Sequence, residues 1–182
     1  MAVDNLRPRP ARRPAHALRD VIRPGVRVLF VGINPGLRSA AVGHHFAGYS
    51  NRFWKLLFES HLVSEPIDWT SDARLPEWGF GITNLVGRAT AGISELEPSD
   101  FHGGRRALVA KIQRLRPEFV ALVGVTLFRS LFPKADFRGL GLQTERLGSA
   151  TVFVLPNPSG RNANCSYREM LDAFRALKAQ LS

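Results

Sequence analysis

The stretch Arg27-Val-Leu-Phe-Val-Gly-Ile-Asn-Pro-Gly36 contains the pattern that decides the fold of this chain. Its first seven residues, 27–33, form an almost unbroken apolar run, as expected of a strand buried on both faces of a parallel sheet. Asn34-Pro35-Gly36 then ends the strand, because proline and glycine favour a tight turn. The stretch therefore predicts a central strand that runs directly into a polar turn.

Apolar strands and amphipathic helices alternate along the rest of the chain. Further strands are predicted at 80–83, 119–123 and 151–155, with an edge strand at 142–147 in the otherwise irregular segment 133–149. Helices are predicted at 50–62, 100–116, 126–132 and 167–181, the last introduced by the capping box Ser166-x-x-Glu169. Strands separated by helices pair in parallel through right-handed crossovers. We therefore predict an α/β fold, a three-layer α/β/α sandwich with a short, mainly parallel central sheet.

The size and composition of the chain limit its organisation. It has 182 residues, of which 45% are hydrophobic and 22% charged, a composition typical of one soluble globular domain. The apolar runs fall far short of the ~20 residues that cross a membrane. A single cysteine, Cys165, excludes an internal disulfide and cysteine-rich metal sites and fits a reducing, cytoplasmic setting. We predict a basic tail rich in arginine and proline at 1–24 and a single α/β domain at 25–182.

The chain is strongly basic. It contains 25 Lys+Arg against 15 Asp+Glu, a formal net charge of +10, and residues 1–27 alone hold seven arginines and two acidic residues. The planar guanidinium of arginine suits phosphate groups and base edges, so this excess indicates a polyanionic partner such as nucleic acid. For the tail itself, an arm that raises DNA affinity and an inert solvated extension both fit the composition.

Two polar turns follow predicted strands at what should be the same edge of the sheet. One is Asn34-Pro35-Gly36, and the other is Pro156-Asn157-Pro158-Ser159-Gly160. In open parallel sheets, ligands bind outside the carboxyl ends of the strands. Either turn alone is also explained as a good turn former. Because both would face one pocket, the two together predict a ligand site between them.

Five short motifs occur in a fixed order along residues 26–180. They are Gly32-Ile-Asn-Pro-Gly36, Gly43-His-His-Phe-Ala47, Asn51-Arg-Phe-Trp54, Gly81-Ile-Thr-Asn-Leu-Val86 and Leu155-Pro-Asn-Pro-Ser-Gly160. In this order and spacing the chain resembles the mismatch-specific uracil-DNA glycosylases, the bacterial relatives of thymine-DNA glycosylase in the uracil-DNA glycosylase superfamily. The resemblance implies hydrolysis of the N-glycosidic bond of a flipped-out uracil, in a U:G mismatch and with other damaged pyrimidines as further substrates, to leave an abasic site.

The resemblance also assigns roles to individual residues. Asn34 would position the attacking water, because an amide cannot accept a proton at neutral pH and so cannot be a true general base. Phe46 would stack on the flipped base, the backbone of Ile33 and Phe46 would meet its polar edge, and Asn84 would add a polar contact. The loop after the last strand would enter the DNA through Asn157, Ser159, Gly160, Arg161 and Asn162.

Two residues leave questions about the reaction open. Arg161 departs from the family pattern, which has an apolar wedge at this position, and this leaves the preference for guanine as the opposite base open. A carboxylate would be a stronger base than an amide, so we searched the segment 93–101 for one. We take Asp100 as an accessory catalytic candidate, against the alternative that the pair Ser99-Asp100 caps the following helix.

The remaining signals favour a monofunctional glycosylase without a cofactor. No lysine in the motifs is placed to form a Schiff base, and His44 and His45 lack the cysteine or carboxylate partner of a metal site, so we expect no metal. The expected partner is double-stranded DNA with a mismatched or damaged base, bound by a monomer at the cytoplasmic nucleoid and not at a membrane. The alternative is a non-catalytic DNA-binding module of the same fold, which would not need Asn34 and Phe46.

Overall fold

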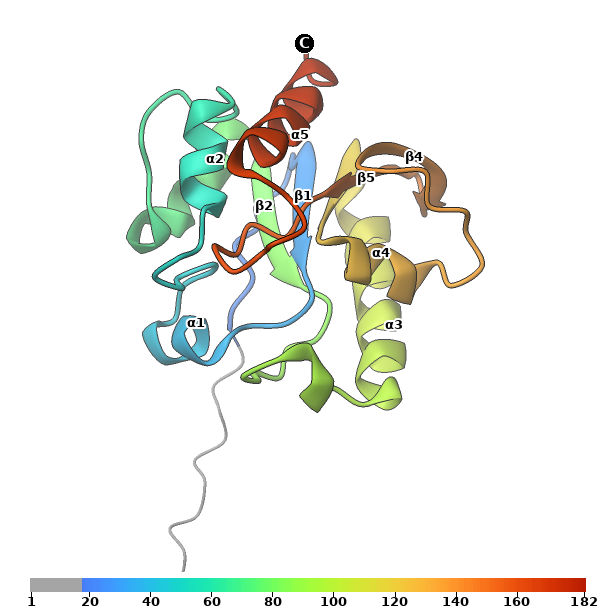
Figure 1. Ribbon diagram of the computed structural model, residues 1–182. Coiled ribbons are helices and arrows are strands. Elements are labelled where there is room, and N and C mark those ends of the chain that lie inside the picture. The colour runs from blue at the N-terminus through green and yellow to red at the C-terminus, as the bar shows by residue number, and fades with distance from the viewer. Residues whose placement is uncertain (1–17) are drawn as a thin grey trace, which may run out of the picture.

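A five-stranded sheet lies at the centre of the computed structural model, which describes residues 18–182 (Figure 1). The strands are β1 (Val28–Gly32), β2 (Phe80–Asn84), β3 (Phe119–Val123), β4 (Gly141–Leu147) and β5 (Ala150–Leu155). Their order in the sheet is β2-β1-β3-β5-β4. Neighbouring strands pair in parallel except at the β4 edge, which is antiparallel. The predicted short, mainly parallel sheet is confirmed.

Helices cover both faces of this sheet. They are α1 (Leu37–Val42), α2 (Phe53–Glu59), α3 (Pro98–Leu115), α4 (Val125–Leu131) and α5 (Tyr167–Ala179), with 3-10 segments η1 (Trp69–Trp78) and η2 (Ile93–Glu95). Figure 1 shows α2 and α5 on one side of the sheet and α3 and α4 on the other. This is the predicted three-layer α/β/α arrangement.

The first strand connects the two layers because its side chains alternate between them. Val28 and Phe30 pack toward α2 and α5, where the Phe30 ring meets Phe53 edge to face at 5.3 Å between centroids. Leu29 and Val31 pack on the other face toward α3 and α4. All four side chains are fully buried. The uninterrupted apolar run of β1 follows from this burial on both faces.

Three helical segments, α1, η1 and the three-residue η2, were not predicted from the sequence. The six-residue α1 starts at Gly36 without a side-chain cap, and η1 contains Pro76 and a kink at Ser71, so neither has the signals of an ordinary helix. The helix predicted to begin at residue 50 begins at Phe53 instead. Its preceding residues bind the loop after β5, with Arg52 N donating to the Pro158 carbonyl at 2.9 Å.

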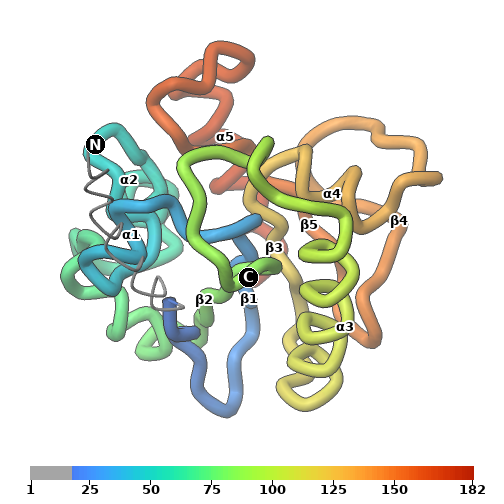
Figure 2. The backbone as a smooth tube through the Cα atoms, turned by 90° about the horizontal axis from the view of Figure 1, so that it is seen from below, coloured from blue at the N-terminus to red at the C-terminus, as the bar shows by residue number. Residues whose placement is uncertain are grey.

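The order of the strands places a crevice at one edge of the sheet. After β1, the next strand in the chain, β2, pairs with one edge of β1, whereas β3 pairs with the other edge. Ligands of open α/β sheets bind at such switch points, outside the carboxyl ends of the strands. The segments after β1 and β2 leave this edge at the bottom of Figure 1, and Figure 2 views the molecule from there.

Residues 18–24, which the sequence places in the basic tail, contact the domain. Val21 exchanges two backbone hydrogen bonds with Ile82, at 3.0 and 2.8 Å. The Asp20 carboxylate accepts from Lys111 Nζ at 2.6 Å and from Thr83 Oγ1 at 2.5 Å. These contacts attach the start of the described chain to β2 and α3. Residues 1–17 of the predicted tail lie outside the described residues.

The close approach of α3 to the chain after β2 gives a test of the packing. A Cβ at Gly104 would overlap the backbone carbonyl of Leu85, whereas a Cβ at Gly103 would meet nothing within 4 Å. We expect Gly104→Ala to lower the free energy of unfolding by about 1–3 kcal/mol through overpacking. The matched control Gly103→Ala should raise it by about 0.5–1 kcal/mol, because alanine favours the helix. Urea denaturation measures both, and equal shifts in the two variants would contradict this packing.

Candidate functional site

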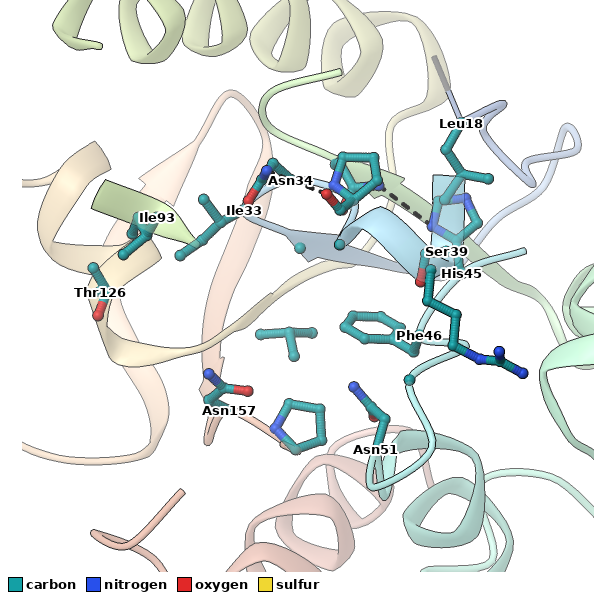
Figure 3. A pocket seen from close by; sticks show the side chains of 18 residues that line it. Leu18, Ile33, Asn34, Ser39, His45, Phe46, Asn51, Ile93, Thr126 and Asn157 are labelled. Carbon is teal, nitrogen blue, oxygen red and sulfur yellow. Dashed lines mark hydrogen bonds between the residues drawn. The ribbon is translucent and has the colours of Figure 1, made fainter. Parts of the chain in front are cut away.

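A cavity of about 380 Å³ opens at the carboxyl edge of the sheet (Figure 3). Residues from the ends of all four parallel strands line it: Asn34 after β1, Asn84 at the end of β2, Thr126 after β3 and Asn157 after β5. Its volume lies in the range of ~300–1,000 Å³ typical of small-molecule sites. The two asparagine-bearing turns therefore face one cavity.

The Asn34 side chain is held from its nitrogen side. Its Nδ2 donates to Thr90 Oγ1 at 2.7 Å and to the backbone carbonyl of Arg88 at 3.0 Å. A carbonyl can only accept, and the Thr90 hydroxyl already donates to the Gly92 carbonyl at 2.8 Å, so the orientation of the amide is determined. Within residues 18–182, Oδ1 of Asn34 has no hydrogen-bond partner. This oxygen is free to accept a hydrogen bond from a water or ligand.

The segment that holds Asn34 is in turn fixed by an ion pair. Arg88 Nη2 donates to Asp100 Oδ2 at 2.6 Å and to the Glu95 carbonyl at 2.8 Å. Asp100 Oδ2 also accepts from the Glu97 backbone N–H at 2.9 Å, which closes a capping box at the start of α3. The hydrogen bond from Arg88 is the main reason that the pKa of Asp100 lies below its ordinary value.

Asp100 does not line the cavity. The structure therefore gives this residue the capping role that the sequence left as the alternative. Asp100 is connected to Asn34 through Arg88, whose side chain pairs with Asp100 and whose backbone carbonyl accepts from Asn34.

Phe46 presents one ring face to the cavity and packs the other on the core. Its ring stacks on Phe53 at 4.3 Å between centroids, and its backbone is left-handed, with φ at 49°. The loop that adopts this conformation is tied to the buried carboxylate of Asp72, which bonds His44 Nδ1 and the His45 backbone N–H, both at 2.9 Å. These bonds hold the Phe46 ring at the wall of the cavity that Asn34 also lines (Figure 3).

His45, whose sequence context suggested only a metal ligand, is a residue of the site. It is buried at the cavity wall, with Nε2 2.9 Å from the Arg19 carbonyl and Nδ1 3.5 Å from Asn84 Nδ2. Because a carbonyl can only accept, Nε2 carries the proton and Nδ1 of the neutral ring accepts from Asn84. Burial lowers the pKa of His45, which favours this neutral form. The presence of His45 in the same motif as Phe46 was the available signal.

The Ile33 backbone, which was predicted to contact the base, already makes a hydrogen bond within the protein. The Ile33 carbonyl accepts from the Val86 N–H at 2.8 Å, and its side chain lines the cavity. Asn84 is half-buried, and its Oδ1 lies next to Gly32, where a Cβ would crowd it. Asn84 therefore presents an acceptor at the cavity wall.

The five residues predicted to enter DNA lie on one loop, but only Asn157 lines this cavity. Its Oδ1 accepts from the Ser159 N–H at 3.0 Å, and Asn162 Nδ2 donates to the Asn157 carbonyl at 2.9 Å, so both amides hold the loop. Gly160 packs so closely on Ser50 that a Cβ would overlap the Ser50 carbonyl, 2.6 Å away. Arg161 is exposed on the loop. Ser159, Arg161 and Asn162 line a second cavity of about 640 Å³ beyond it.

Nowhere among residues 18–182 do three or more His, Cys, Asp or Glu side chains gather as they would around a metal ion. None of the helices there is long and apolar enough to cross a membrane.

A family model matches residues 19–178 of the chain, and its description is the uracil DNA glycosylase superfamily. The matched range includes every residue that lines the cavity at the sheet edge except Leu18. The match is to the superfamily as a whole and does not single out the mismatch-specific branch that the motifs resemble.

The lowered pKa of His45 predicts a pH dependence of stability. The unfolded chain binds this proton near pH 6.5, and the folded chain only at lower pH. Below pH ~6.5 the unfolded chain gains a proton on this residue that the folded chain does not bind. The free energy of unfolding is therefore unaffected by His45 above pH ~6.5, and it falls by up to about 1.4 kcal/mol per pH unit as the pH drops toward the folded pKa. Urea denaturation at pH 7.5 and 5.5 should show a smaller loss for His45→Asn than for the unsubstituted protein. The exposed control His61→Asn should keep the full loss, and an unchanged loss in His45→Asn would refute the assignment.

Proposed function

The chain belongs to the uracil DNA glycosylase superfamily, and we propose that it excises uracil from U:G mismatches in double-stranded DNA. Membership supports the general activity, that of a hydrolase that removes uracil from DNA by cleaving the N-glycosidic bond. The mismatch preference, the other damaged pyrimidines as substrates and the catalytic assignments are the finer parts of the proposal. The observation that carries it is the Asn34 amide, anchored through Nδ2 with Oδ1 left free at a cavity of base-binding size.

The first step is the capture of a uracil nucleotide that has left the base stack. The uracil ring lies against Phe46, whose other face is supported by Phe53, and a base–aromatic stack contributes about 1–3 kcal/mol. Asn84 Oδ1 accepts from the N3–H of the base, because Asn84 Nδ2 is directed to His45. This pocket selects a flat base with a donor at that position.

The second step is hydrolysis. A water donates to Asn34 Oδ1, which directs the water oxygen toward C1′ of the sugar. The bond between C1′ and N1 of uracil breaks with its electron pair on the base, which leaves an oxocarbenium-like sugar that needs a nucleophile held in line. The water oxygen bonds to C1′, and its proton passes to solvent or to the departing uracil anion. Asn34 orients the water and accepts no proton.

The proposal includes a monofunctional reaction without strand cleavage, metal or cofactor. No lysine is among the described residues that line the cavity, so no lysine amine is present there to form a Schiff base with the sugar. Arg161 takes the place of the apolar wedge and donates to the opposite base. We place the protein in the cytoplasm at the nucleoid, as a monomer. The alternative function is a non-catalytic DNA-binding module of the same fold.

Single-turnover release of uracil from a U:G duplex tests the role of Asn34. We expect Asn34→Ala to lose at least about tenfold in rate, or roughly 1.4 kcal/mol of barrier. The exposed amide of Gln113 on α3 provides the matched control, and Gln113→Ala should keep the full rate. U:A and single-stranded uracil, assayed in parallel, report the preference for the opposite base. Tight binding of the duplex with no excision by the unsubstituted protein would favour the binding-module alternative.

Asp100 is proposed as a positioning residue that acts through Arg88. Removing its carboxylate frees the segment whose carbonyl holds Asn34, so Asp100→Ala should lower kcat severalfold with KM unchanged. Ser166→Ala, which removes the cap of α5 instead, is the control. Both variants should lose about 0.5–2 kcal/mol of stability as helix caps, and only Asp100→Ala should lose rate. Equal kcat in the two would reduce Asp100 to a cap.

A further inference from the structure

Beside the base cavity lies a polar and aromatic cluster that the proposed reaction does not use. It consists of Arg38 from α1 and Tyr49 from the loop between α1 and α2, with Trp69 behind them. The Tyr49 side chain is 89% exposed, the most exposed of the large apolar side chains described. Fully exposed aromatic rings next to a binding cavity commonly belong to an interaction surface.

The guanidinium of Arg38 lies over the Tyr49 ring and near the Trp69 ring. Its central carbon is 3.6 Å from the centroid of the Tyr49 ring and 5.5 Å from that of Trp69. Such cation–π contacts hold the arginine and one face of the tyrosine in place. The opposite face of the Tyr49 ring stays open to solvent, as its exposure requires.

The cluster has a fixed position relative to the cavity. Arg38 Nε donates to the Ala47 carbonyl at 2.7 Å, and Ser39 Oγ accepts from the Ala47 N–H at 3.1 Å. Two side chains of α1 therefore hold both backbone groups of Ala47, two residues before Tyr49. Arg38 and Gly48 both line the base cavity. Figure 1 shows α1 at the same edge of the sheet as the turn after β1.

Arg38, a lining residue of the base cavity, retains donors that the described residues leave unused. Its Nε is occupied by Ala47, but among residues 18–182 no carboxylate pairs with its terminal nitrogens. A guanidinium without a carboxylate partner, half-buried beside a base pocket in a chain of net charge +10, suits a phosphate group.

We propose that Arg38 and Tyr49 clamp the target DNA strand at the mouth of the cavity. Arg38 binds a phosphate next to the nucleotide in the cavity, and the open face of Tyr49 stacks on a neighbouring base. The partner is a short stretch of the substrate strand distorted by base extrusion. This inference rests on the proposed function, since it places the strand by the nucleotide that enters the cavity.

Single-turnover excision at increasing enzyme concentration separates binding from chemistry. Tyr49→Ala should raise the half-saturating enzyme concentration about tenfold, the effect of losing one stacked base, with the maximal rate unchanged, and Tyr49→Phe should keep the affinity. Replacing the base on one side of the uracil with an abasic analogue should lower the DNA affinity of the unsubstituted protein by a similar factor. The same replacement should not lower the DNA affinity of Tyr49→Ala any further.

The phosphate contact is tested in the same way. An uncharged methylphosphonate next to the uracil nucleotide, on the 5′ or the 3′ side, should lower the DNA affinity of the unsubstituted protein. It should not lower the affinity of Arg38→Ala any further. Arg38→Lys should recover part of the affinity as a point charge. Arg114→Ala, at the far end of α3, controls for the loss of one positive charge and should keep the affinity at moderate salt.

The outcomes distinguish this inference from the proposed function. If the unsubstituted protein excises uracil and Tyr49→Ala and Arg38→Ala bind as tightly as it does, the clamp is refuted and the glycosylase activity stands. The clamp is also refuted if the DNA analogues weaken each variant by the same factor as the unsubstituted protein. If the unsubstituted protein releases no uracil, the proposed function fails, and binding to a duplex with a central abasic analogue still tests the clamp.

Discussion

The burial of β1 on both faces and along both edges is the constraint on which the rest of the structure depends. β1 pairs in parallel with β2 and β3 in a register that sets Gly32 opposite Asn84 and Val31 opposite both Thr83 and Leu122. Its side chains are fully buried, so a shift by one residue would exchange the contents of the two helical layers. The position of Asn34, two residues beyond the strand, is therefore determined by the core of the protein.

Hydrogen bonds to backbone carbonyls then orient the polar side chains of the cavity. Asn34 is held by the carbonyl of Arg88, and His45 lies against the carbonyl of Arg19. Because a carbonyl can only accept, each contact decides which atom of the side chain carries hydrogen. The free acceptor of Asn34 and the position of the His45 proton on Nε2 both follow from segments distant in the sequence, whereas burial favours the neutral state of the His45 ring. Preorganised groups of this kind are what a hydrolytic site needs, since they need no reorganisation during the reaction.

The cavity and its surroundings divide the work of binding between two kinds of group. Inside, Phe46 and the amides of Asn34 and Asn84 are suited to a flat, uncharged base. At the rim, Arg38, and outside the cavity, Tyr49 and Arg161, provide cationic and aromatic groups that suit a sugar-phosphate strand and its stacked bases. This separation fits a membership in the uracil DNA glycosylase superfamily, where a base must be removed from a polyanionic duplex.

The sequence by itself determined the order of the strands and of helices α2 to α5, the mainly parallel pairing and the sheet edge where the candidate site lies. Those properties follow from local apolar periodicity and turn residues, which the run 27–36 carries within ten positions. The motifs that contain Asn34 and Phe46 also indicated the family. Local patterns could not reveal α1 and η1, because neither has ordinary helix signals.

Only the tertiary structure decided which groups hold these side chains. The contacts of Asn34 with Thr90, of His45 with Arg19 and of Arg38 with Tyr49 join residues that no periodicity connects. It also placed Asp100 at a helix cap outside the cavity, 66 positions after Asn34 in the chain. The physical reason is that hydrogen bonds and ring contacts act over a few ångströms in space, and the distance between residues in space is known only once the sheet and its helices have packed.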